Sequence, residues 1–278
     1  MNRYLSEENL GRVKEDFGPV LKRVIESCGE YDLRLREDYF NIYCRGNSLA
    51  KIEFGVDGAY EVSINKRFAE GVFDGDRRFA PPRVSDDTLV WRVTGNLVNP
   101  FFQTTHLRKL AKNIDYVDHS EEANFEQQII ADNLDNPNRL IVDRQILHPG
   151  RRNDKLDLLA LVRPSAGAEF NFHVIEVKMG NNPELSEKVA GQLDRYCALV
   201  KTNVESWKKG YRKTVEQLRA LEFFPSLDLS SLKIGSSVTG SIDVFGYSGI
   251  AKTAIRQLKL KRPDLRVKLF SFELGDGE

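Results

Sequence analysis

The clearest pattern of apolar and polar positions lies in residues 171–178, Asn-Phe-His-Val-Ile-Glu-Val-Lys. Valine and isoleucine are enriched here and polar residues bound the run, which predicts a β-strand. Because side chains alternate across a strand, Glu176 and Lys178 share one face, while Ile175 and Val177 share the other. Two charges on an apolar strand are costly unless they are paired or bind a metal, so Glu176 and Lys178 form either a structural ion pair or a site.

A second strand is predicted just upstream, over residues 155–162. This run is almost continuously apolar, which is typical of a strand buried on both faces, and Asp157 stands near its start. The connection to the next strand contains Pro164 and Gly167, which indicate a turn. Two strands joined in this way pair as antiparallel neighbours, which brings Asp157 beside Glu176. The alternative is that Asp157 only ends its strand.

Two helices flank these strands in the sequence. Residues 120–134 are predicted to be a helix with Ser120 as its N-cap, and Glu126 borders its apolar face. Residues 185–200 are predicted to be a helix after Pro183, and Gln192 and Tyr196, four residues apart, share one face of it. The alternatives are a surface position for Glu126 and an ordinary core position with a polar tip for Tyr196.

Periodicity over the rest of the chain predicts an α/β protein whose N-terminal part is α+β. An amphipathic helix is expected over residues 6–28, interrupted or kinked by Pro19, and an antiparallel β-meander over 31–68. We expect a boundary near residue 115, with an accessory domain over 1–115 and a second domain over 116–278. The second domain should hold a mixed central sheet flanked by helices. Its further predicted elements are strands at 139–147, 240–247 and 266–274 and helices at 204–221 and 251–260. Before this domain we expect a loop at 74–88, a strand at 89–93 and a helix near 107–112.

Composition excludes several classes of protein. The 41 basic and 41 acidic residues cancel, so bulk charge indicates neither a nucleic acid nor a membrane partner. No apolar run is long enough for a membrane span, and the polar N-terminus is unlike a signal peptide. The three cysteines are far apart and form no metal-binding or disulfide pattern, which fits a reducing, cytoplasmic location.

Charge is nevertheless segregated along the chain. Residues 252–268 carry seven basic residues and one acid, whereas residues 115–135 carry seven acids and no base. Cations that hold phosphates and carboxylates that hold a metal are what a phosphodiester-cutting protein needs. The alternative for a basic run is a solvated face. The candidate nucleic-acid contacts are Lys208, Lys209, Lys252, Arg256 and Lys259.

The order of these motifs resembles that of the PD-(D/E)XK nuclease superfamily. A helix Glu126 is followed by a strand Asp157 and then by Glu176-x-Lys178. The next helix carries Gln192-x-x-x-Tyr196, as in the RecB-type subset. The resemblance covers residues 120–196, and it departs from the pattern in one place, since the residue before Asp157 is not proline. It implies a restriction-endonuclease-like core for the second domain.

The resemblance also implies a chemistry, the hydrolysis of phosphodiester bonds, most simply in DNA, with Mg²⁺ or Mn²⁺. Asp157 and Glu176 would be the main metal ligands, the backbone carbonyl of Val177 another, and Glu126 would complete or orient the site. An unperturbed lysine has a pKa of about 10.4, so we favour an electrostatic role for Lys178 over a role as general base. Gln192 and Tyr196 would contact DNA or the water at the metal.

Two alternatives stay open at this stage. The chain could be a catalytically inactive module of the nuclease fold that binds nucleic acid or assembles a complex, or Glu176 and Lys178 could be only a buried ion pair. The four histidines form no ligand pair, and His173 lies on the strand face opposite Glu176. The sequence leaves open DNA versus RNA, cutting from ends versus within the strand, a pathway such as phage defence or repair, a homodimer or partner protein, and the role of the N-terminal domain.

Overall fold

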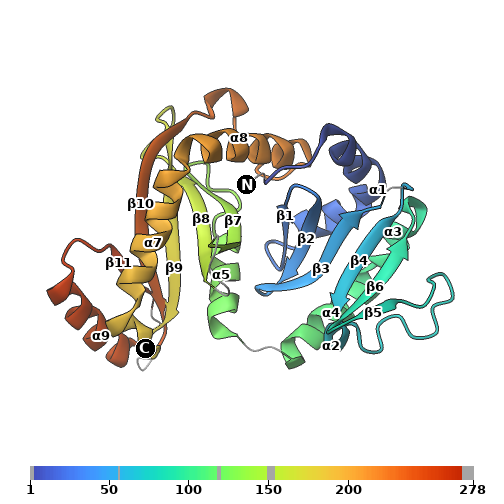
Figure 1. Cartoon of the computed structure of the whole chain (residues 1–278), viewed down its shortest axis with the longest axis horizontal. Helices are drawn as coiled ribbons and strands as arrows, with labels where there is room; N and C mark the ends of the chain where they lie inside the picture. Colours follow the sequence, from blue (N-terminus) through green and yellow to red (C-terminus); the bar gives the residue numbers. More distant parts are fainter. Residues whose placement is uncertain (1–2, 56, 118–119, 149–153, 271–278) are drawn as a thin grey trace, which may run out of the picture. The chain divides into compact units, whose positions relative to one another are not determined.

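The computed structural model describes residues 3–55, 57–117, 120–148 and 154–270 (Figure 1). The chain divides into two compact units, which we describe separately. Unit 1 comprises Met1–Asp135 and Gly210–Leu227, and unit 2 comprises Asn136–Lys209 and Asp228–Glu278. The predicted boundary near residue 115 stays a prediction.

Unit 1 begins with helix α1 (Glu7–Glu26), which is followed by an antiparallel sheet. The side chain of Ser6 accepts a hydrogen bond from the Asn9 amide, and two glutamates occupy the first turn, so both side-chain capping and the helix dipole favour this start. Pro19 lies within the helix without dividing it. The sheet has the order β1-β2-β3-β4-β6-β5, and its strands are β1 (Tyr31–Leu35), β2 (Tyr39–Cys44), β3 (Asn47–Phe54), β4 (Tyr60–Asn65), β5 (Arg83–Ser85) and β6 (Thr88–Val93).

The core of unit 1 lies between α1 and this sheet. Phe17 of α1 is fully buried and packs edge-on against Phe40 and Tyr60, with ring centroids 5.0 Å away in both cases. Four further helices complete this part of the chain: α2 (Lys66–Ala69), α3 (Gly95–Phe101), α4 (Thr104–Val117) and α5 (Glu121–Ala131). Ser120 caps α5 as predicted, by accepting a hydrogen bond from the Ala123 amide.

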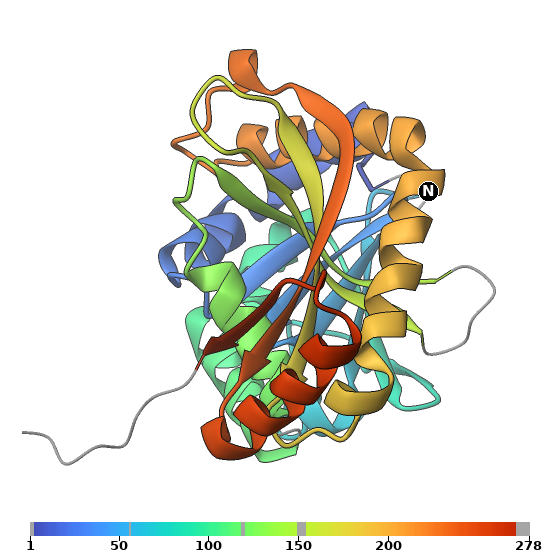
Figure 2. The same cartoon turned by 90° about the vertical axis from the view of Figure 1, so that its left-hand side faces the viewer.

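Unit 2 contains a mixed sheet of order β11-β10-β9-β8-β7. The strands β7, β8 and β9 are antiparallel neighbours, whereas β9, β10 and β11 run parallel. The parallel pairs need crossover connections, which contain helices beside this sheet (Figure 2). The elements are β7 (Arg139–Leu147), β8 (Lys155–Val162), β9 (Phe170–Met179), β10 (Ile234–Phe245), β11 (Val267–Phe270), α6 (Glu184–Glu187), α7 (Val189–Thr202), α8 (Val204–Ala220), a 3₁₀ turn (Leu229–Ser231) and α9 (Ser248–Lys261); the division between the units falls within α8.

The predicted fold class is confirmed: an N-terminal helix and an antiparallel sheet precede a mixed sheet that is flanked by helices. Strands β7 and β8 have the predicted bounds. The prediction of one helix over 185–200 was wrong, because Lys188 has φ −118° and separates α6 from α7. The break escapes the pattern because apolar residues continue at four-residue steps through it, at Leu185, Val189 and Leu193.

Other differences concern the ends and the short elements. Strand β10 begins at Ile234, six residues before the predicted start. The prediction missed its first half because polar residues there hide the apolar pattern of a strand. Helices α2 and α3 and strand β5 were not predicted, since each has seven residues or fewer and gives little periodicity. Of the predicted strand 266–274, residues 271–274 lie outside the described residues. Within the described ranges, no helix combines the length and the apolar character that crossing a membrane requires.

We predict that Gly46→Ala destabilises the protein more than Gly58→Ala. Both glycines have φ +81°, where alanine costs about 1 kcal/mol or more. A Cβ at Gly58 meets nothing within 4 Å, whereas a Cβ at Gly46 collides with the backbone carbonyl of Ala123 in α5. We therefore expect an additional loss of roughly 2 kcal/mol in the free energy of unfolding for Gly46→Ala, measured by urea denaturation. Equal losses for the two variants would contradict the close packing of α5 at this turn.

Candidate functional site

The candidate site lies where β8 and β9 separate. Toward the start of β8, their ladder ends at Leu158, which pairs with Ile175. Beyond that pair, the Val177 amide donates a hydrogen bond to Asp157 Oδ2 at 2.8 Å, so a side chain replaces the backbone acceptor. Because Leu159 pairs with Val174, Asp157 lies on the sheet face that also carries Glu176. The pairing of β8 with β9 thus places Asp157 and Glu176 on the same face, as the sequence predicted.

Glu176 and Lys178 form an ion pair on this face. Lys178 Nζ lies 2.9 Å from Glu176 Oε1, and both side chains are buried. Lys178 Nζ also lies 3.8 Å from Glu184 Oε2, at the start of α6. An ammonium held between two carboxylates is favoured in its charged form. The arrangement therefore suits an electrostatic role for Lys178.

Helix α7 covers the same face of the sheet. Gly240 pairs with Val174, and a Cβ at Gly240 would collide with Leu193 and Cys197 of α7, which places this helix over the Glu176 face. Tyr196 of α7 is buried, and its hydroxyl donates to Asp154 Oδ1 at 2.5 Å. Asp154, immediately before β8, also lies 3.5 Å from the Arg195 guanidinium.

Tyr196 interacts with several acidic residues of unit 2. Burial raises the pKa of its phenol well above the usual range, and the hydrogen bond to Asp154 and the charges of Glu176 and Asp157 add to this effect. For Asp154, burial opposes ionisation, but the Tyr196 hydroxyl and Arg195 outweigh it and lower the pKa of the carboxyl. Tyr196 is therefore a neutral donor among carboxylates.

Gln192 precedes Tyr196 by one helical turn and shares its face of α7. Its amide oxygen Oε1 is buried and has no hydrogen-bond donor among the residues that the structure describes. Burying such an acceptor unpaired costs about 1–3 kcal/mol, which a bound water, metal-bound water or substrate donor would offset. In the Gln-x-x-x-Tyr motif, Gln192 Oε1 therefore has no hydrogen-bond partner among the described residues, whereas the Tyr196 hydroxyl is bonded to Asp154.

Glu126 was predicted to complete the site. It is buried, so the surface alternative for this residue is wrong. Helix α5 belongs to unit 1, whereas Asp157, Glu176 and Lys178 belong to unit 2. Its participation in a metal site stays a prediction.

The predicted nucleic-acid contacts are on two helices. Lys252, Arg256 and Lys259 are exposed on α9, and their spacing of four and three residues puts them on one face. None of these three cations forms an ion pair with another described residue. Lys208 of α8 is instead paired with Glu205 at 3.2 Å, and Lys209 is exposed.

The donors on the Glu176 face suit a hard divalent cation. Asp157, Glu176 and the Val177 carbonyl offer oxygen, and so does the unpartnered Gln192 amide, which are the ligand types that Mg²⁺ and Mn²⁺ prefer. Among the described residues, however, no group of three or more histidine, cysteine or acidic side chains is gathered for a metal. A metal here would be held by two carboxylates together with carbonyl oxygens and water.

Sequence reasoning missed Asp154 and Glu184. Asp154 lies three residues before Asp157 and outside the strand, so the two-residue period of β8 does not include it. Glu184 looked like an ordinary acidic residue in the first turn of a helix. A signal for Asp154 was present, since a buried tyrosine needs a partner for its hydroxyl.

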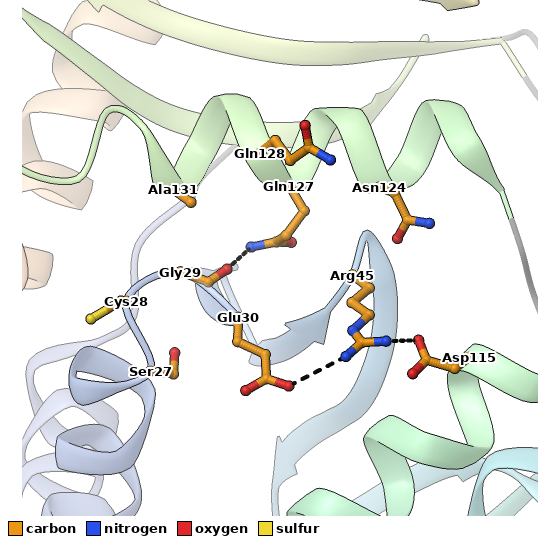
Figure 3. A pocket seen from close by; sticks show the side chains of 10 residues that line it. All are labelled: Ser27, Cys28, Gly29, Glu30, Arg45, Asp115, Asn124, Gln127, Gln128 and Ala131. Carbon is orange, nitrogen blue, oxygen red and sulfur yellow. Dashed lines mark hydrogen bonds and ion pairs between the residues drawn. The ribbon is translucent and has the colours of Figure 1, made fainter. Parts of the chain in front are cut away.

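Unit 1 contains a separate polar pocket of about 460 Å³ beside α5 (Figure 3). Gln127 joins its walls, because the amide donates to the Gly29 carbonyl at 2.7 Å and accepts from the Gly46 amide at 3.3 Å. Arg45 is paired with Asp115 and Glu30. By helical geometry, Glu126 lies on the opposite side of α5 from the pocket. These contacts fix α5 to the sheet of unit 1.

We predict that Tyr196→Phe destabilises the protein by roughly 2 kcal/mol at pH 7, because Asp154 loses a hydrogen bond. The pKa of Asp154 is lower in the folded than in the unfolded state, so its stabilisation is present above the unfolded value of about 3.9 and is lost as the pH falls through the folded value. The difference between the variant and the wild type should therefore shrink toward pH 2.

The measurement is the free energy of unfolding in urea at several pH values. Tyr247→Phe is the control, because this tyrosine is 48% exposed. A destabilisation by Tyr196→Phe that does not change with pH would contradict the pairing with an ionised Asp154.

Comparisons with family models, curated proteins and solved structures found no match for this chain. The resemblance to PD-(D/E)XK nucleases therefore stays a prediction from the motif residues. What the site does has to be inferred from its own chemistry.

Proposed function

We propose that the chain is a metal-dependent nuclease that hydrolyses phosphodiester bonds, most simply in DNA. The observation that carries this proposal is the hydrogen bond from the Val177 amide to Asp157. It holds a carboxylate at the point where β8 leaves β9, on the face that carries Glu176 and Lys178. A structural ion pair explains Glu176 and Lys178, and the Val177 amide explains an acceptor at residue 157, but two carboxylates and a lysine on one face are also the arrangement that a divalent cation and a phosphate need.

In this proposal Asp157, Glu176 and the Val177 carbonyl hold Mg²⁺ or Mn²⁺, and Glu126 stays a predicted further ligand. When bound, such an ion lowers the pKa of a water and polarises a phosphoryl oxygen. Lys178 remains charged between Glu176 and Glu184 and stabilises the negative charge that develops at phosphorus. Gln192 accepts a hydrogen bond from the attacking water or from the substrate, and Tyr196, held by Asp154, fixes α7 over the site.

Binding of the substrate would use the exposed cations of α9. Lys252, Arg256 and Lys259 can each contact one phosphate, and Lys209 can add another on α8. We also propose a cytoplasmic location, because Cys28, Cys44 and Cys197 are free thiols.

The second candidate function is a non-catalytic module that binds nucleic acid or assembles a complex. The exposed cations of α9 favour it, because they can hold phosphates without any metal. It predicts binding of nucleic acid without cleavage under any metal. The third reading, a purely structural ion pair, predicts neither metal binding nor cleavage.

We predict that the wild type cleaves DNA with Mg²⁺ or Mn²⁺ and that Asp157→Asn lowers the rate about 100-fold or more. Asparagine keeps an acceptor for the Val177 amide, so the fold should survive. Lys178→Gln should also lower the rate, while Glu187→Gln, an exposed acid of α6, should not. The assay compares supercoiled plasmid, linear duplex and single-stranded DNA, with an RNA strand alongside.

Binding of Mn²⁺, measured by calorimetry, separates the alternatives. Metal binding that Asp157→Asn abolishes, together with cleavage, supports the nuclease. Nucleic-acid binding without cleavage favours the binding module. Failure of the wild type to bind Mn²⁺ and to cut any of these substrates would overturn the proposed function.

We predict that replacing Lys252, Arg256 and Lys259 together with glutamine weakens binding of a DNA duplex. If each cation contacts one phosphate, the slope of log affinity against log salt should become shallower by about two to three. Fluorescence anisotropy in EDTA measures binding without cleavage. A matched variant removes three exposed lysines elsewhere, Lys14, Lys112 and Lys201, and should leave the slope unchanged. Equal slopes in both variants would exclude α9 as the contact surface.

A further inference from the structure

The second face of the unit 2 sheet carries a buried polar stripe that the proposed nuclease chemistry does not use. It crosses three strands, because His173 of β9 pairs in register with Thr239 of β10, and Asp243 of β10 pairs with Lys268 of β11. Ser241 lies between the two β10 positions on the same face. His173, Ser241 and Asp243 are each less than 5% exposed.

A chain of hydrogen bonds orients Asp243. The Ser241 hydroxyl donates to Asp243 Oδ1 at 2.7 Å, so it accepts from His173 Nε2, which lies 3.0 Å away. With the imidazole neutral, His173 Nδ1 accepts from the Thr239 hydroxyl at 2.8 Å, which is shorter than the 3.5 Å from this hydroxyl to the Phe172 carbonyl. This order needs a neutral imidazole, and burial together with nearby cations lowers the pKa of His173 to about 3. Thr239, His173 and Ser241 therefore orient the Asp243 carboxylate without adding any charge of their own.

Two cations lie beside that carboxylate, and Arg266 acts electrostatically on both of them. Arg139 reaches across from β7, with Nη2 3.8 Å from Asp243 Oδ2, and Lys268 Nζ lies 3.6 Å from the same oxygen. Burial lowers the pKa of both cations, Asp243 opposes this effect, and Arg266 adds to it. Within the part of the chain that the structure describes, Asp243 is the one carboxylate that acts on both Arg139 and Lys268, so with His173 neutral the described cluster has more positive than negative charges.

Arg139 also has donors without an acceptor. Its Nε and Nη2 atoms are buried and make no hydrogen bond to any residue that the structure describes, since 3.8 Å to Asp243 is too long for one. A buried donor without an acceptor is unfavourable, and an anion that enters the cluster would supply the acceptor. The side chains of Arg139 and Lys268 are 21% and 25% exposed, and Arg266 is exposed, so the cluster opens to the surface at its edge.

We propose that Arg139, Arg266 and Lys268 bind a phosphate group, with Asp243 holding two of these cations in position. A phosphate supplies the missing charge and the acceptor oxygens, and the planar guanidinium suits two of them at once. The phosphate belongs either to the backbone of a nucleic acid or to a free phosphate or mononucleotide. The inference does not depend on the metal site, because a non-catalytic module would bind phosphate equally well.

The competing explanation is a structural charge network, and Asp243→Asn distinguishes the two. A phosphate site gains affinity when its only carboxylate becomes neutral, whereas a structural network only loses stability. Arg266→Gln should weaken binding about tenfold, as expected for the loss of one charge-assisted hydrogen bond. Because Arg266 is exposed, this variant remains informative if Asp243→Asn does not fold. Lys201→Gln, another exposed cation of unit 2, is the control.

Calorimetry with inorganic phosphate, a 5′-mononucleotide and a short single-stranded DNA in EDTA tests the proposal. Weaker binding of any of these probes by Arg266→Gln, but not by Lys201→Gln, supports the site, and the probe affected identifies the source of the phosphate. Tighter binding by a folded Asp243→Asn variant supports it further. If all variants bind every probe as the wild type does, or if the wild type binds none, the cluster is structural and the proposal is overturned. Loss of DNA cleavage with unchanged phosphate binding would affect only the proposed nuclease.

Discussion

The hydrogen bond between the Val177 amide and the Asp157 carboxylate is the constraint on which the candidate site depends. A buried amide needs an acceptor, and β8 can leave β9 after Leu158 only because Asp157 supplies one. The same bond holds the carboxylate on the face of Glu176 and Lys178. The same hydrogen bond therefore ends the β8–β9 pairing and positions the Asp157 carboxylate, so a substitution of Asp157 affects both.

Strand β9 has charged or polar residues on both faces, which is unusual for a buried strand. One face carries Glu176 and Lys178 under α7, and the other carries His173 within the Asp243 network. The two groups have opposite charge balance: Lys178 lies between two carboxylates, whereas Asp243 lies beside the two cations Arg139 and Lys268. The two faces therefore differ in what they can bind. One offers oxygen ligands that suit a cation, and the other offers N–H groups that suit an anion.

In unit 1, the position of α5 is fixed by two close backbone approaches and one side chain. Gly29 and Gly46 leave no room for a Cβ against this helix, and Gln127 bonds to the backbone of both turns. The predicted metal ligand Glu126 is thus carried by a helix with a defined place in its own unit. This gives the N-terminal part a physical task, the fixing of α5, beyond covering a core.

The sequence by itself determined the strands that carry the site, because apolar runs and two-residue alternation are local properties. Residues 155–162 and the common face of Glu176 and Lys178 were predictable for that reason. Tertiary structure alone decided the partners that lie far apart along the chain. Asp154 meets Tyr196 across 42 residues, and Arg139 reaches Asp243 from β7 over two intervening strands. Such pairs depend on strand order and register, which no local period encodes, so the polar network on the second face became visible only when the sheet was assembled.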